Sequence, residues 1–250
     1  ITAVLCILIG GALHLVPVKN RKMHGRDGFM AVALGWIALS LTGALPYVLT
    51  GALDSYVDAV FETVSGLTTT GSTVFPEVEH LPYSVLLWRS LTQWMGGMGV
   101  LVLFLALMPK LGDGAVYLMR AESPGPIKSK LVPKVGSTAK ILYGIYFALT
   151  MLELVFLLVG RMPLFEALLT AFGTAGTGGF GFRNDSFARF SPYIQWVVTI
   201  FMILFGVNFN AYFLLLMRKF RRAAASEEVR GYFVVIVVAV GIITANIYSM

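Results

Sequence analysis

Two short stretches rich in glycine and threonine constrain the fold of this chain more than any other feature. They are SGLTTTGST at residues 65–73 and FGTAGTGGFG at residues 172–181. One common offset aligns Gly66 with Gly173, Thr70 with Thr177 and Gly71 with Gly178. Each stretch follows a short apolar segment, at residues 54–66 and 163–173, and precedes a long apolar one. The order of long helix, half-helix, loop and long helix is therefore predicted to occur twice.

The predicted half-helices are too short to cross a bilayer. About thirteen residues of α-helix extend about 20 Å, whereas the hydrocarbon core is about 30 Å thick. Bare backbone is tolerated at this depth only where protein buries it or where it lines a water-filled cavity. Glycine lets successive carbonyl groups turn toward one path and threonine adds a hydroxyl acceptor, so such a loop can replace the hydration shell of a monovalent cation. A glycine-rich turn is the simpler alternative, but its repetition in the same helical context favours an ion filter.

The composition indicates an all-α integral membrane protein. Hydrophobic residues make up 57% of the 250 residues, charged residues make up 13%, and the mean hydropathy is +0.80. A soluble domain of this length could not bury so much apolar surface. His14, His24 and His80 lack the spacing of a metal site, and no catalytic constellation stands out, so we expect no enzyme. We expect the chain to be the middle of a longer protein, because it opens at Ile1 and stops at Met250 within apolar runs.

Long apolar segments predict membrane spans at residues 28–50, 84–108, 137–160, 192–217 and 231–248. The sequence GVNFN at residues 206–210 interrupts one of them, which predicts a broken helix. Asp54 can cap the first half-helix, Asp58 lies in its first turn, and Pro163 suits the first turn of the second. The negative dipole end of each half-helix then points at the Gly/Thr loop, where a cation would lie.

Charged residues are distributed unevenly between the predicted loops. Most of the 19 Lys and Arg residues lie at residues 19–26, 110–140 and 218–230. The acidic residues on the other side are Asp54, Asp58, Glu62, Glu77, Glu79, Glu166 and Asp185. By the positive-inside rule, the basic loops are cytoplasmic and both filter loops face outward, where an acidic vestibule would concentrate cations. The excess of basic residues that gives the net charge of +6 lies mainly in these cytoplasmic loops, so we expect no nucleic-acid partner.

Several polar residues lie within the apolar segments, where they are costly unless they are paired. For Gln93 and Glu153 we expect hydrogen bonds or ion pairs between helices, with a coupling-ion role for Glu153 as the weaker alternative. Arg89 either snorkels to the outer interface or forms a salt bridge with a half-helix carboxylate such as Glu62. The run GGMG at residues 96–99 allows close backbone approach between helices.

Longer motifs extend across the chain. They are FETVSGLTTTG at residues 61–71, WRSLTQWMGGMG at residues 88–99, AESPGP at residues 121–126 followed by Lys128 and Lys130, and FMILFGVNF at residues 201–209 together with the second loop at residues 174–181. With these motifs the chain resembles, essentially from end to end, the Trk/Ktr/HKT superfamily of potassium transporters, and in particular its TrkH-type membrane subunit.

This resemblance implies potassium-channel-like helix–pore loop–helix repeats, two complete and two partial. Residues 1–27 would hold the end of repeat one, residues 28–135 repeat two, residues 136–230 repeat three with its broken helix, and residues 231–250 the start of repeat four. The implied ion-binding filter residues are Thr68, Thr69, Thr70, Gly71, Ala175, Gly176, Thr177 and Gly178. The transported ion would be K⁺, with no organic cofactor. The implied gate comprises Gly206, Asn208 and Asn210.

The resemblance also implies potassium uptake across the bacterial cytoplasmic (inner) membrane by a multi-pass homodimer. Its basic loops would contact membrane lipid and a cytoplasmic ring of nucleotide-binding regulatory subunits of the TrkA/KtrA type. We expect Lys128, Lys130 and Lys134 to help dock that ring, with topology and lipid contact alone as the alternative. Channel-like flow and ion-coupled symport both stay open, as does a sodium-selective or sodium/potassium-coupled member of the superfamily. A non-transporting membrane scaffold is the alternative of a different class.

Overall fold

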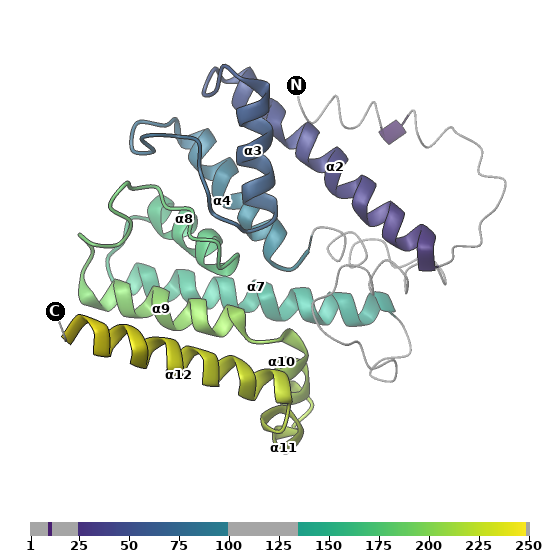
Figure 1. The fold of residues 1–250 in the computed structure, drawn as a ribbon, viewed down its shortest axis with the longest axis vertical. Coiled ribbons are helices and arrows are strands. Elements are labelled where there is room, and N and C mark those ends of the chain that lie inside the picture. Colours follow the sequence, from purple (N-terminus) through teal and green to yellow (C-terminus); the bar gives the residue numbers. More distant parts are fainter. Residues whose placement is uncertain (1–9, 12–24, 100–134, 249–250) are drawn as a thin grey trace.

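The computed structural model describes residues 10–11, 25–99 and 135–248, and every regular element in these ranges is a helix (Figure 1). The all-α class predicted from the sequence is therefore confirmed over this part of the chain. The helices are α2 (Gly25–Leu49), α3 (Tyr56–Leu67), α4 (Tyr83–Gly97), α7 (Val135–Val159), α8 (Leu164–Ala175), α9 (Pro192–Gly206), α10 (Phe209–Leu216), α11 (Phe220–Ala224) and α12 (Glu227–Tyr248).

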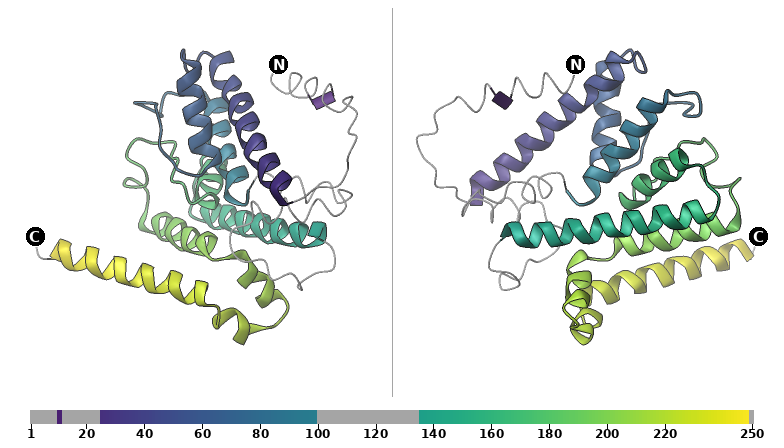
Figure 2. Two further views of the ribbon diagram at one scale, coloured as in Figure 1. Left: turned by 45° about the vertical axis from the view of Figure 1, so that its right-hand side comes forward. Right: turned by 180° about the vertical axis from the view of Figure 1, so that it is seen from behind.

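Two successive units of the chain share one design, as predicted. In each unit a long helix is followed by a half-helix of 12 residues, a loop and a third helix. The first unit is α2, α3 and α4, and the second is α7, α8 and α9. Figure 1 shows the first unit above the second, with α12 along the lower edge, and Figure 2 shows the same arrangement from two further sides. The helix α4 packs against α8 and so joins the two units.

The first residues of the half-helices differ from the prediction. Ser55, and not Asp54, caps α3, because its side-chain oxygen accepts a hydrogen bond from the backbone N–H of Asp58 at 3.3 Å. The extended backbone of Ser55 has the geometry that an N-cap requires. Pro163 takes the N-cap position of α8, one residue before its first turn. Asp58 and Glu166 lie in the two first turns, where carboxylates stabilise the positive dipole end.

The helix α4 ends earlier than predicted. Its last residue is Gly97, and residues 100–108 of the predicted span lie outside the described residues. Glycine is a poor helix former, which accounts for an end at this glycine run. The predicted close packing is confirmed, since a Cβ on Gly96 would collide with the backbone of Leu67 and a Cβ on Gly97 with the hydroxyl of Tyr146. The run therefore brings α4 directly against the C-terminal end of α3 and against α7.

The predicted break in the last span of the second unit is also confirmed. Only Val207 and Asn208 separate α9 from α10, and the two helices are bent by 87°. Because both pieces are apolar, together they have the length and composition of one bent membrane span.

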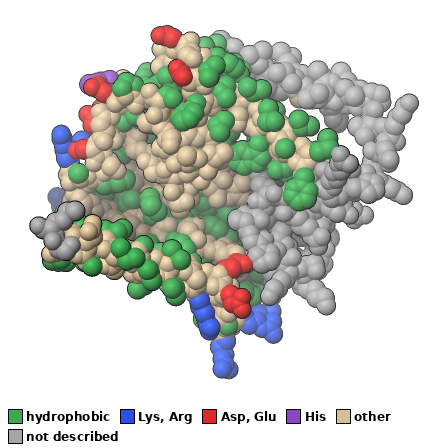
Figure 3. All heavy atoms as spheres, in the orientation of Figure 1, with side chains coloured by type: hydrophobic (Ala, Val, Ile, Leu, Met, Phe, Trp, Pro, Cys, Tyr) green, Lys and Arg blue, Asp and Glu red, His purple; other side chains and the backbone are tan. Residues whose placement is uncertain are grey.

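Three of the described helices, α2, α7 and α12, are long and apolar enough to cross a membrane, or four spans exist if α9 and α10 form one. Large hydrophobic side chains such as Phe29, Val155 and Val237 are exposed on their outer faces, and Figure 3 shows hydrophobic side chains spread over the visible surface. Such surfaces are stable in lipid or against further protein. The fold is that of a multi-pass membrane protein.

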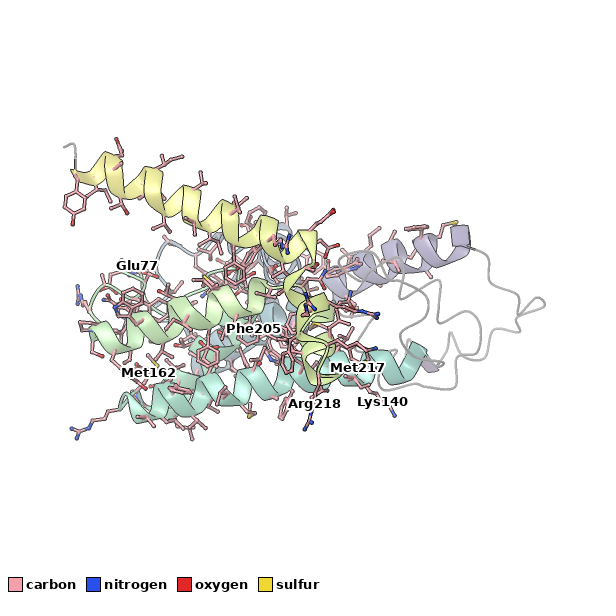
Figure 4. All side chains as sticks on the ribbon, turned by 90° about the horizontal axis from the view of Figure 1, so that it is seen from below. Glu77, Lys140, Met162, Phe205, Met217 and Arg218 are labelled. Carbon is pink, nitrogen blue, oxygen red and sulfur yellow. The ribbon has the colours of Figure 1, made fainter. Side chains whose placement is uncertain are left out.

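Charged residues are distributed unevenly between the two ends of these helices, although Arg161 follows α7 at the acidic end and Glu227 and Glu228 open α12 at the basic end. Figure 4 shows Glu77 and Met162 at one end of α7 and α9, and Lys140, Met217 and Arg218 at the other. Glu77 belongs to the loop between α3 and α4, whereas Arg218 opens the basic segment that leads into α11. This separation agrees with the predicted orientation, in which the basic end is cytoplasmic.

A cluster of aromatic side chains packs beneath the second half-helix. Tyr146 of α7 makes edge-on contacts with Phe205 and Phe209, with ring centroids 5.5 and 5.8 Å apart. Its hydroxyl donates a hydrogen bond of 2.9 Å to the carbonyl of Trp94 in α4. These contacts tie α4, α7 and α9 together below the second Gly/Thr loop.

Candidate functional site

Each half-helix ends in a loop in which one threonine and one glycine take left-handed backbone conformations. In the first loop they are Thr69 and Gly71, with φ of 55° and 76°. In the second loop they are Thr177 and Gly179, with φ of 53° and 81°. A positive φ is uncommon for a residue with a β-branched side chain, so the surroundings must hold both loops in a conformation that a free chain avoids.

The repeat in the structure is one residue out of step with the repeat in the sequence. The sequence alignment pairs Gly71 with Gly178, whereas the backbone conformation pairs Gly71 with Gly179. The helix ends follow this second register, because α3 ends at Leu67 and α8 ends at Ala175. The predicted equivalence of Gly71 and Gly178 therefore does not hold for the backbone, although both glycines lie in the loops.

The two loops are in direct backbone contact. A Cβ on Gly71 would collide with the carbonyl oxygen of Gly178, and a Cβ on Gly178 would lie 2.5 Å from the carbonyl oxygen of Thr69. Only glycine allows two backbones to approach so closely. The fold thus brings together two segments, far apart in the sequence, that were predicted to form one site.

The predicted filter residues fall into two groups by exposure. The exposed or half-buried ones are Thr68, Thr69, Thr70, Gly71, Thr177 and Gly178. The other two are buried at the end of α8: Ala175 lies in the buried hydrophobic cluster that also contains Tyr146 and Phe205, and a Cβ on Gly176 would lie 2.8 Å from the carbonyl oxygen of Gln93. The first group is accessible in the described part of the chain, whereas the second group packs against α4.

A buried ion pair fixes the first loop. Arg89 of α4 donates to Glu62 of α3 over 2.7 Å, and the two side chains are only 2% and 0% exposed. The Glu62 carboxylate also accepts from the hydroxyl of Thr73 at 2.9 Å and from the N–H of Val74 at 3.0 Å. Of the two alternatives for Arg89, the salt bridge is confirmed and snorkelling is wrong. Because Glu62 is buried in this pair, its predicted place in an outer acidic vestibule is also wrong.

Gln93 and Glu153 were both predicted to have a polar partner within the apolar segments, but only Gln93 has one among the described residues. The side-chain oxygen of Gln93 accepts a hydrogen bond of 3.3 Å from the N–H of Phe180, so it is paired, but with the second loop and not with a helix. Glu153 of α7 is fully buried, and neither of its carboxylate oxygens is hydrogen-bonded to a described residue. Thr174 lies close to this carboxylate without meeting hydrogen-bond geometry. The partner predicted for Glu153 is therefore not found in the described part of the chain.

Two tyrosines hold the break between α9 and α10. Tyr212 of α10 donates its hydroxyl to the carbonyl of Leu204 at 2.6 Å, and Tyr232 of α12 donates to the carbonyl of Ile203 at 3.0 Å. Both carbonyls lie in the last turn of α9, where the break removes the usual N–H donors four residues on, although the carbonyl of Leu204 also accepts from the N–H of Val207 at 3.2 Å. Because such groups need partners within a membrane, the hydroxyls stabilise the bent form.

The predicted gate residues lie together at this break. The side-chain oxygen of Asn208 accepts from the N–H of Asn210 at 2.9 Å and so caps α10, while its amide nitrogen donates to Glu228 of α12. A Cβ on Gly206 would collide with the side chain of Tyr232. Gly206 and Asn208 thus connect the break to α12, and Asn210 contributes its backbone N–H.

A cavity of about 430 Å³ lies between α9, α12 and the segment that contains the second loop. Its lining includes Gly179 of the loop, Met202 and Ile203 of α9, and Tyr232 and Ile236 of α12. Tyr232, whose hydroxyl is bonded to the carbonyl of Ile203 next to the break, therefore also lines this cavity.

Sequence reasoning missed four residues that hold the site, namely Thr73, Tyr212, Glu228 and Tyr232. A hydroxyl within an apolar segment needs a partner, so the two tyrosines could have been flagged as ligands of an unwound backbone. Thr73 lies in the first Gly/Thr stretch but was not among the predicted filter residues, and Glu228 carries no such signal because it lies in a polar stretch. The predicted docking residues Lys128, Lys130 and Lys134 lie outside the described residues.

Comparison with known proteins gives matches over most of the chain. Residues 1–240 match the sequence model of the TrkH family, described as a cation transport protein. The chain is 42% identical over 208 residues to the Trk system potassium uptake protein TrkH of Halomonas elongata, a match that covers 81% of this chain and 43% of that protein. It is 41% identical over 204 residues to the protein of the same name from Escherichia coli K12, covering 79% of this chain and 42% of the relative.

A third relative and a solved structure agree. The Trk system potassium uptake protein TrkG of Escherichia coli K12 is 34% identical over 239 residues, covering 94% of this chain and 49% of that protein. The crystal structure of the potassium transporter TrkH from Vibrio parahaemolyticus is similar with a TM-score of 0.60 and 34% identity, covering 80% of this chain and 39% of that one. The chain thus spans less than half the length of the relatives it matches.

Proposed function

Because the chain belongs to the TrkH family of cation transport proteins, as its motifs predicted, we propose that it forms the central part of a protein that takes potassium into the cell through a filter of pore loops. Membership of a transport family also bears out the prediction that the chain is not an enzyme. The observation that carries the proposal is the direct contact between two loops that each follow the C-terminal end of a half-helix.

In this proposal the exposed part of the loops supplies the ion ligands. K⁺ binds to oxygen atoms of Thr68, Thr69, Thr70, Gly71, Thr177 and Gly178, while the buried Ala175 and Gly176 support the second loop. The C-terminal dipole ends of α3 and α8 favour a cation at this position. The hydroxyl oxygens of Thr68 and Thr70, 2.8 Å apart, add acceptors next to the backbone carbonyls. Pore loops of the other two repeats complete the ring.

The gate in this proposal is the break between α9 and α10. Gly206, Asn208 and Asn210 form this break, and Gly206 packs against Tyr232, which lines the cavity between α9 and α12, so a shift of the break moves one wall of that cavity. The hydroxyl bonds of Tyr212 and Tyr232 favour the bent, closed arrangement.

We place the protein in the bacterial cytoplasmic membrane as a homodimer, with its basic end toward the cytoplasm. A ring of nucleotide-binding subunits of the TrkA/KtrA type docks there and regulates the gate. The support for this placement is family membership and the concentration of Lys and Arg residues at one end of the helices.

Reversing Lys128, Lys130 and Lys134 to glutamate is expected to weaken co-purification with the nucleotide-binding subunit. Insertion stays intact, because other basic residues remain on the same side. Binding of the unaltered protein should also weaken as salt rises, because surface charge contacts are screened. Reversal of Arg218, Arg221 and Arg222 is the matched comparison. If neither the lysine reversal nor added salt weakens binding, this loop does not dock the regulatory subunit and only sets the membrane topology.

The reversal potential of the full-length protein in proteoliposomes tests the proposed function. With graded potassium, sodium and proton gradients, we expect the potential to follow the potassium gradient. A potential that follows sodium instead would identify a sodium-selective protein, and one that depends on two gradients together would identify coupled transport. If correctly inserted protein shows no flux of any ion, the proposal is overturned, and the alternative of a non-transporting membrane scaffold is favoured.

A further inference from the structure

We propose that one face of α4, through Arg89 and Gln93, sets the position of the two filter loops relative to each other and thereby determines potassium selectivity without contacting the ion. This inference rests on the proposed function of the loops as a filter. Arg89 and Gln93 lie one turn apart on α4 and reach both loops, so they are positioning residues for the site that the loops form.

Arg89 connects the two loops directly. Its Nε donates to Glu62 at 2.7 Å, one Nη donates to the hydroxyl of Thr73 after the first loop at 3.2 Å, and the other donates to the carbonyl of Gly181 after the second loop at 3.2 Å. The guanidinium also lies over the ring of Phe180, 4.4 Å from its centroid. A planar guanidinium donates in fixed directions, so these contacts determine where both loops leave the site.

Gln93 holds the second loop one turn further along α4. Its side-chain oxygen accepts from the N–H of Phe180 at 3.3 Å, and its amide nitrogen lies so close to Gly178 that a Cβ there would be 2.6 Å away. Gln93 is fully buried and its amide nitrogen has no hydrogen-bond partner among the described residues, so the bond from Phe180 is the contact that holds its side chain. Gly178 is also the residue whose carbonyl touches Gly71, so Gln93 supports the contact between the loops.

The second unit has no acidic, basic or amide side chain at the positions equivalent to Glu62, Arg89 and Gln93. Counted from the first residue of each helix, Glu62 corresponds to Thr170, Arg89 to Val198 and Gln93 to Met202. These residues cannot form an ion pair or a charged fork. The bracing is therefore a specific feature of the contact between the first and second loops, and not a general requirement of the repeat.

Two conservative variants of the full-length protein test this inference. Arg89→Lys keeps the charge but loses the forked contacts to Thr73 and Gly181, and Gln93→Met keeps the volume but loses the bond to Phe180. We expect each to lower the potassium/sodium permeability ratio by about tenfold, because displacements of about 1 Å at a positioned group have effects of this order or larger. The ratio is measured from reversal potentials and does not depend on the amount of protein inserted.

Trp88→Phe is the matched control on the same helix. Trp88 donates to the carbonyl of Gly43 in α2 at 2.9 Å, so this variant loses a packing hydrogen bond that touches neither loop. A folded, conducting Arg89→Lys or Gln93→Met protein with the unaltered ratio would overturn the inference, as would an equal fall in Trp88→Phe. If Arg89→Lys does not fold, the permeability ratio of Gln93→Met alone tests the inference. An unaltered protein that lacks potassium selectivity would count against the proposed function and not against the bracing.

Discussion

Replacing Gly71 with serine in the full-length protein is expected to lower the potassium/sodium permeability ratio by at least about tenfold. The serine Cβ would collide with the carbonyl oxygen of Gly178, so the two loops must separate and their carbonyl oxygens must move. The φ of 76° adds strain of about 1–2 kcal/mol for a residue with a side chain. Gly178→Ser should act in the same direction, because its Cβ meets the carbonyl oxygen of Thr69 at 2.5 Å.

Gly51→Ser separates backbone strain from loop contact. Gly51 follows α2 with a φ of 69°, similar to that of Gly71, but no atom lies within 4 Å of the position of its Cβ. It should therefore add a similar backbone strain without the collision and leave the permeability ratio unchanged. If Gly71→Ser and Gly178→Ser both keep the ratio of the unaltered protein in bi-ionic reversal-potential measurements, neither glycine belongs to the filter.

Deleting residues 206–210 is expected to raise potassium flux when the regulatory partner is absent. The deletion removes the bend of 87° and separates the carbonyls of Ile203 and Leu204 from the hydroxyls of Tyr232 and Tyr212. Each such hydrogen bond contributes about 1 kcal/mol net, so losing both favours the open form by about thirtyfold. The measurement is potassium flux into proteoliposomes per inserted protein. A folded deletion variant with closed or unaltered conductance would contradict a gate at this break.

Tyr232→Phe offers a milder form of the same test. It removes one of the two hydroxyl bonds and should raise basal flux by about fivefold. Tyr193→Phe is its control. Tyr193 lies at the end of α9 opposite the break, and its hydroxyl donates to the carbonyl of Phe156 in α7 at 3.2 Å, so it touches neither the break nor α12. Equal effects of the two substitutions would indicate general loosening of α9 and not opening of a gate.

The elements of this fold follow closely from the sequence. The half-helix predicted at residues 54–66 is observed at Tyr56–Leu67, and the one predicted at residues 163–173 is observed at Leu164–Ala175. The break predicted at residues 206–210 separates α9 from α10. Segment length, hydropathy and glycine content are local properties, and they determine whether a segment can cross a bilayer, must return, or must unwind.

Local sequence did not determine which of two adjacent residues takes a structural position, such as the N-cap of a helix or an equivalent place in the two loops. Asp54 and Ser55 are both good N-caps, and only the backbone angles around the first turn select Ser55. The same holds for the repeat, because the sequence aligns Gly71 with Gly178 and the helix ends shift that register by one residue. Both errors are of one residue, which is the scale at which packing and not composition determines a boundary.

The sequence by itself determined that this chain is a membrane protein with two half-helices, two Gly/Thr loops and one broken span. Only the tertiary structure decided that Arg89 is buried against Glu62, 27 residues away, and that Arg89 and Gln93 reach the second loop as well. The physical reason is that the free energy of a buried charge or amide depends on the partners that surround it. Those partners come from α3, α4 and both loops, and they meet only once the chain has packed.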